Sequence, residues 1–178
     1  MSNVLIGIIG VILFIGLALA GAMILGDDFT TATASSKAAS IVQGMQQASN
    51  AYAMNTLRTG TPISADQGDT VIAQLISSKR LKSAPINPIV GGGPVIGYDD
   101  IGQRNAAKPM GTLAMPLGAG PNKSIRDVCY AIEEQMGNPN PSASVDLKVN
   151  YDVKVTTDRR VGCMYNFYSN AYAAYVTL

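Results

Sequence analysis

Two cysteines carry the clearest chemistry in this 178-residue sequence. Cys129 and Cys163 are compatible with a disulfide, with two free thiols or with half of a zinc site. Histidine is absent from the chain, so a closed zinc site with four ligands would need unusual partners. We therefore predict a disulfide between Cys129 and Cys163, provided that this part of the chain leaves the cytoplasm, because disulfides persist in oxidising compartments.

The remaining candidate chemical groups do not form an enzyme site. The absence of histidine removes the commonest general base. Glu133 and Glu134 are the only glutamates, and as helical neighbours they project about 100° apart, so we predict a solvated face rather than an acid–base pair. The glycine run 91–93 lacks the Lys and Ser/Thr of a phosphate-binding loop and indicates a turn. We predict no catalytic residue, no cofactor and no metal, and we expect no enzyme.

Nucleic-acid binding is also disfavoured by the composition. The formal net charge is +1 and charged residues make up 14% of the chain, so no broad basic field is available. Five tyrosines between Tyr151 and Tyr175 could stack on bases or sugars. Packing within a sheet is the commoner role, and basic residues are not interleaved with these tyrosines beyond Arg160. We predict no specific nucleic-acid partner.

The elements that would position these groups begin with a long apolar segment. Val4 to Leu25 is a run of 22 residues without a charge or a strong polar group. As a helix it would reach roughly 33 Å, enough to cross the hydrocarbon core of a membrane. Small residues let helices approach closely in an apolar medium, although a simple anchor is an equal alternative. The glycines concerned are Gly7, Gly10, Gly16 and Gly21.

The helical pattern continues beyond this segment with a different character. Apolar residues recur at three- and four-residue steps to about Arg58, and the sequence 59–62, Thr-Gly-Thr-Pro, supplies a stop signal. We predict one helix with an apolar part, 1–28, and an amphipathic part, 29–60, followed by a globular head, 61–178. Gly26 and Gly44 are candidate points of helix flexibility. The predicted apolar stripe is Ala34, Ala38, Ile41, Val42, Met45, Ala48 and Tyr52.

The head is predicted to contain two further helices. The first would begin at Asp69 or Thr70 and run through Leu81, with Lys79, Arg80 and Lys82 in its last turns. The second, 124–137, would be capped by Ser124 and would direct Cys129 inward.

Strands are predicted in three parts of the head. Short edge strands are expected at 95–98 and 112–117, and strict alternation predicts a strand over 145–155. Residues 161–178 should hold one or two more strands. The fold class is therefore α+β, with the long helix packed on a C-terminal antiparallel sheet. A bridge between Cys129 and Cys163 would stabilise this head by roughly 3 to 4 kcal/mol.

The order of these features resembles the type IV pilin superfamily over essentially the whole chain. Asn87-Pro88 followed by Gly91-Gly92 is similar to a turn of the type IVb branch, and Asp127-Val128-Cys129 is similar to its cysteine-bearing helix. The resemblance implies a pilin fold in a subunit that a prepilin peptidase frees of its leader. It further implies an inner-membrane anchor before assembly.

The pilus assembly machinery would then pack identical subunits into an extracellular helical filament. The filament would serve adhesion, aggregation or conjugative DNA transfer. The packing positions implied are Met1 and Leu5 with the four glycines of the apolar segment. One departure is Leu5, because the family usually carries Glu at the fifth mature position.

Two alternatives remain at this point. The chain could be a minor pilin or a pseudopilin of a secretion system, since some subunits lack that Glu. It could also be a single-pass membrane protein with an extracytoplasmic binding head.

Overall fold

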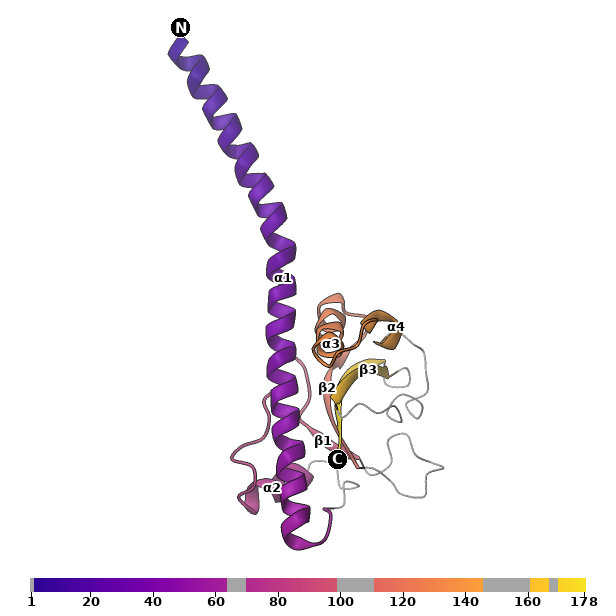
Figure 1. Cartoon of the computed structure of the whole chain (residues 1–178). Coiled ribbons are helices and arrows are strands. Elements are labelled where there is room, and N and C mark those ends of the chain that lie inside the picture. Colours follow the sequence, from indigo (N-terminus) through magenta and orange to yellow (C-terminus); the bar gives the residue numbers. More distant parts are fainter. Residues whose placement is uncertain (1, 64–69, 99–110, 146–160, 167–169) are drawn as a thin grey trace. The chain divides into compact units, whose positions relative to one another are not determined.

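The computed structural model describes residues 2–63, 70–98, 111–145, 161–166 and 170–178, without the side chains of 2–6, 22–28 and 143–144. The chain is α+β, as predicted, and forms two compact units, Met1–Thr33 and Ala34–Leu178. Figure 1 labels the elements, which are α1 (Ser2–Thr59), α2 (Thr70–Ser77), β1 (Ile96–Tyr98), β2 (Thr112–Ala119), α3 (Lys123–Gln135), α4 (Pro141–Val145), β3 (Val161–Asn166) and β4 (Ala171–Thr177).

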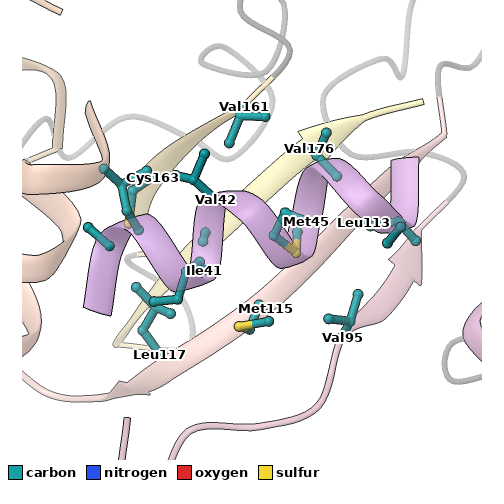
Figure 2. Close-up of a cluster of buried hydrophobic side chains, with 14 of the residues drawn as sticks. Ile41, Val42, Met45, Val95, Leu113, Met115, Leu117, Val161, Cys163 and Val176 are labelled. Carbon is teal, nitrogen blue, oxygen red and sulfur yellow. The ribbon is translucent and has the colours of Figure 1, made fainter. Parts of the chain in front are cut away.

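The amphipathic part of α1 supplies one side of the core of the second unit. Six of the seven predicted stripe residues are buried, and Tyr52 is half-buried, with its hydroxyl donating to the Ile63 carbonyl at 2.8 Å. Figure 2 shows Ile41 and Met45 among apolar side chains of the sheet, including Met115. The helix ends at the predicted stop, where Gly60 adopts a φ of +70° that favours glycine.

The four described strands form one antiparallel sheet in the order β1-β2-β4-β3. The strands expected at 95–98 and 112–117 are present as β1 and β2, but β2 lies between β1 and β4, so its prediction as an edge strand is wrong. Its Pro116 pairs with Ala173 of β4 but lies beyond Ala114, the last residue that pairs with β1, so the missing N–H costs no hydrogen bond to β1. The C-terminal region forms β3 and β4, as predicted.

Helix α2 is shorter than predicted. It ends at Ser77, so Lys79, Arg80 and Lys82 follow the helix instead of forming its last turns. Lys79 has a φ of +56°, and the Arg80 N–H donates to the Leu75 carbonyl at 2.9 Å. This left-handed termination is usually made by glycine, which explains why the sequence did not indicate it.

Helix α3 begins and ends with side-chain and main-chain caps. The N-cap is Asn122, whose side chain accepts from the Ser124 N–H at 3.0 Å, so the prediction that Ser124 is the cap is wrong. At the other end Gly137 has a φ of +80°, and the Asn138 N–H donates to the Glu133 carbonyl at 2.9 Å. This is a Schellman termination.

The first residue of the strand predicted over 145–155 lies in a helix. Val145 is the buried last residue of α4, and 146–160 lie outside the described residues. Pro141 starts α4, where its missing N–H leaves no helical bond unmade.

Candidate functional site

The described part of α1 in the first unit carries apolar side chains on all sides. Nine large apolar side chains between residues 8 and 19 are exposed by 49 to 74% of their surface. A helix that is apolar all round is normally covered by lipid or by protein. This surface, the apolar helix surface, therefore needs a covering outside the single chain. Its residues are Ile8, Ile9, Val11, Ile12, Leu13, Phe14, Ile15, Leu17 and Leu19.

The four predicted packing glycines lie along the same stretch of α1. A Cβ atom built at Gly7, Gly10, Gly16 or Gly21 meets no heavy atom within 4 Å. The described chain therefore gives no packing reason for glycine at these positions. Each glycine in a helix interior lowers helix stability by up to about 1 kcal/mol relative to alanine. Among the described residues, no contact offsets this cost at the four positions. A close approach by another helix would explain them.

The other predicted positions in the apolar part, 1–28, are Met1, Leu5 and Gly26. Met1 lies outside the described residues, and the side chains of Leu5 and Gly26 are not described, although both residues belong to α1. Within the described residues, no helix combines the length and the apolar character that crossing a membrane requires.

Gly44 has a packing role within the second unit. It lies inside the continuous helix α1, and a Cβ built on it would be 3.1 Å from the Cβ of Pro85. This separation is shorter than ordinary contact, so the glycine lets the segment after α2 approach the helix closely. The predicted role of Gly44 in helix flexibility stays a prediction.

Gly44→Leu is expected to lower the free energy of unfolding by about 1 to 3 kcal/mol, because the added side chain overpacks the contact with Pro85. Chemical denaturation of the full chain in detergent micelles measures this change. Gln43→Leu is the matched control, since Gln43 is exposed on the same helix and its change should stay within about 0.5 kcal/mol. Equal effects of the two leucines would argue against the close approach.

The Asn87 turn is held by side-chain hydrogen bonds. Asn87 Nδ2 donates to the carbonyls of Gly93 at 3.1 Å and Pro116 at 2.8 Å, and Asn87 Oδ1 accepts from the Ile89 N–H at 3.0 Å. A Cβ on Gly92 would collide with the Asn87 side chain. The glycine run is thus a turn, as its sequence indicated, and Asn87 joins this turn to β2.

The predicted disulfide joins Cys129 of α3 to Cys163 of β3, with their Cα atoms 5.4 Å apart. Both residues are fully buried. The bridge links two elements separated by 34 residues in sequence, and so limits the freedom of the unfolded head.

Glu133 was missed by the sequence analysis and is buried, not solvated. Its side chain is 1% exposed. Its Oε1 accepts from the Cys163 N–H and its Oε2 from Asn138 Nδ2, both at 2.7 Å. The signal that could have found it is Gly137, because a Schellman termination brings the residue after the glycine against the residue one turn before the helix end. Glu134 is exposed, as predicted.

No protein-family profile, curated protein or solved structure matches this chain. Its function is therefore argued from its own residues. Across the described residues, no three His, Cys, Asp or Glu side chains are grouped so that they could hold a metal ion. The apolar helix surface and the disulfide-bridged head are the two features that a functional proposal has to explain.

Proposed function

We propose that this chain is a structural subunit of a type IV pilus of the type IVb kind, which assembles through its N-terminal helix into an extracellular filament. The observation that carries the proposal is the apolar helix surface, with four glycines that meet nothing in the single chain. Identical helices packed side by side would cover the apolar side chains and would use the glycines for close approach.

Two successive environments for the same helix follow from this proposal. Before assembly, the uncharged run from Val4 to Leu25 would lie in the inner membrane, after prepilin peptidase has removed a leader. The pilus assembly machinery would then transfer it to the filament core. Both environments are apolar, so the helix exchanges lipid for copies of itself without exposing its side chains to water.

The docking of one subunit onto the next would rest on packing. Residues 1–26 carry no acidic side chain, and Asp27 is the first acidic residue of the sequence. No carboxylate would therefore enter the apolar core from the first 26 residues, and none would need a charged partner there. Register between subunits would come from the shapes of small and large side chains.

The head supports an extracytoplasmic destination. A disulfide persists in oxidising compartments, and Cys129 and Cys163 are bridged. An α+β head whose sheet packs on the amphipathic part of α1 is compatible with a pilin fold. We include that fold in the proposal, together with a role of the filament in adhesion, aggregation or conjugative DNA transfer.

Electron microscopy of material sheared from cells tests the proposal. Cells expressing the chain should yield long thin fibres, and cells lacking it should yield none. An antibody against the head should label the fibres along their whole length, as expected for a major subunit.

A second candidate is favoured by the absence of glutamate from residues 1–26. A minor pilin or a pseudopilin would also lack the Glu, and it would label fibres sparsely or not at all. Fibres that persist without this chain would establish the minor role. A chain that stays in the inner membrane of cells without fibres would contradict the filament proposal and would favour an anchored binding protein.

A further inference from the structure

A buried polar cluster surrounds the disulfide in the head. Glu133 follows Cys129 by four residues on α3, so the two side chains project from the same face. Both are buried there. Glu133 Oε1 accepts the main-chain N–H of Cys163 at 2.7 Å. The carboxyl group of Glu133 therefore joins α3 to the same residue of β3 that the disulfide joins to α3. We call this contact the carboxyl clamp.

The position of β3 explains why the Cys163 N–H is available. β3 stands at the end of the described strand order, with β4 on one side. Cys163 is opposite Ala174 of β4, and alternate N–H groups of such a strand point away from its neighbour. A buried N–H without an acceptor is costly. The Glu133 carboxyl provides the acceptor from α3.

Asn138 fixes the orientation of the clamp. The Schellman termination of α3 returns Asn138 to Glu133, where its Nδ2 donates to Oε2 at 2.7 Å. The Asn138 Oδ1 accepts from the Asn140 N–H at 3.1 Å, which determines which end of the amide faces Glu133. The Cys163 N–H and the Asn138 amide are thus both donors, and the two acceptor oxygens of the carboxyl satisfy them.

We propose that Glu133, oriented by Asn138, is a positioning residue for disulfide formation, because it places Cys163 beside Cys129 in the reduced chain. The clamp spans 30 residues of sequence. Much of the loop-closure entropy is therefore lost when the clamp forms, and the two thiols then react as neighbours. This inference does not depend on whether the chain forms a filament.

The reaction requires an external disulfide oxidant, such as oxidised glutathione. One cysteine thiolate attacks a sulfur of the oxidant, which forms a mixed disulfide and releases one glutathione thiol. The second thiolate attacks the mixed disulfide, which forms the Cys129–Cys163 bond and releases the second glutathione. The protein loses two electrons and two protons, and the oxidant gains them. The clamp acts on the second step by holding the two cysteines together.

The test equilibrates the full-length chain, in detergent micelles, with mixtures of reduced and oxidised glutathione. Alkylation of free thiols followed by mass measurement gives the fraction of chains with the Cys129–Cys163 bridge. This fraction, at a known ratio of reduced to oxidised glutathione, gives the effective concentration of one cysteine thiol at the other. In Glu133→Gln the amide has one acceptor oxygen, and its NH₂ group meets a donor. We expect the effective concentration to fall about tenfold. Asn138→Ala, which keeps the contact with Cys163, should give a smaller fall.

A swapped pair provides the decisive variant. In Glu133→Gln with Asn138→Asp, the glutamine NH₂ donates to the new carboxylate while its oxygen still accepts from Cys163. The effective concentration should return to within about threefold of the original value. Val71→Ala is the control. Val71 is a fully buried residue of α2, so its truncation lowers the general stability of the head without touching the clamp.

The outcomes separate positioning from general stabilisation. The proposal stands if Glu133→Gln lowers the effective concentration clearly more than Val71→Ala does and the swapped pair restores it. An equal fall of the effective concentration in Glu133→Gln and in Val71→Ala, or no recovery in the swapped pair, overturns the proposal. If Glu133→Gln does not fold, Asn138→Ala and the swapped pair decide the question on the same criteria.

Discussion

Cells that express Gly10→Leu or Gly16→Leu are expected to produce no fibres, although the head of each variant remains folded. A Cβ at either position meets no atom of the single chain within 4 Å, so leucine fits the isolated helix and raises its helix propensity by up to about 1 kcal/mol. In a filament, the same side chain would hold neighbouring helices apart along several turns. Helix packing in apolar surroundings depends on that close approach. The leucine therefore stabilises the helix of the isolated subunit but opposes the packing of subunits into a filament.

The control for these variants is Val11→Leu, which adds one methylene at an exposed apolar position of the same helix. It should leave fibres unchanged in number and length, because Val11 is not a small residue on which close approach depends. Sheared material is compared by electron microscopy, and a folded head is verified by the intact disulfide. Normal fibres in both glycine variants would show that these glycines serve another purpose, and would weaken the packing argument at its base.

The long helix was the most predictable part of the fold. The period of its apolar residues between Ala34 and Ala48 is helical, and Gly60 marks its end, because these signals are local in sequence. Six of the seven stripe residues are buried for the reason that the sequence indicates, which is one apolar face against a sheet. The apolar helix surface was equally visible in the sequence, because it comes from one uninterrupted run of apolar residues.

Two features of the head escaped prediction because tertiary contacts override local preference. Lys79 ends α2 in a left-handed conformation that usually calls for glycine. β2 was expected to be an edge strand, yet it lies between β1 and β4, and its Pro116 lies beyond the residues that pair with β1. At both positions the sequence carries a residue that local conformational preference disfavours, and contacts with other elements of the fold offset that preference.

The buried carboxyl of Glu133 illustrates a different limit. The helical spacing of Glu133 and Glu134 led us to predict a solvated face for both, but Glu133 is buried and Glu134 is exposed. Which of the two is buried depends on the Cys163 N–H, 30 residues later in the chain. The disulfide itself was predictable, since the chain has two cysteines and no histidine. The burial of Glu133 beside the bridge was not predicted, because its partner, the Cys163 N–H, lies 30 residues later in the chain.

Replacing both Cys129 and Cys163 with alanine is expected to lower the free energy of unfolding by about 3 to 4 kcal/mol. The bridge spans 34 residues of sequence, and without it the unfolded chain regains the corresponding freedom. Both sulfurs are in the core, so their removal adds a small cavity cost. Domains of this size are stable by only about 5 to 15 kcal/mol, which makes this a large share of the total.

Urea denaturation of the full chain in detergent micelles, with and without dithiothreitol, separates the bridge from the cavity. The original chain should lose stability on reduction, whereas the double-alanine variant should not respond to the reductant. The difference that remains between the reduced original chain and the variant then measures the cavity alone. A denaturation midpoint that is the same with and without the bridge would mean that the other contacts between α3 and β3, which include the carboxyl clamp, hold the two elements together.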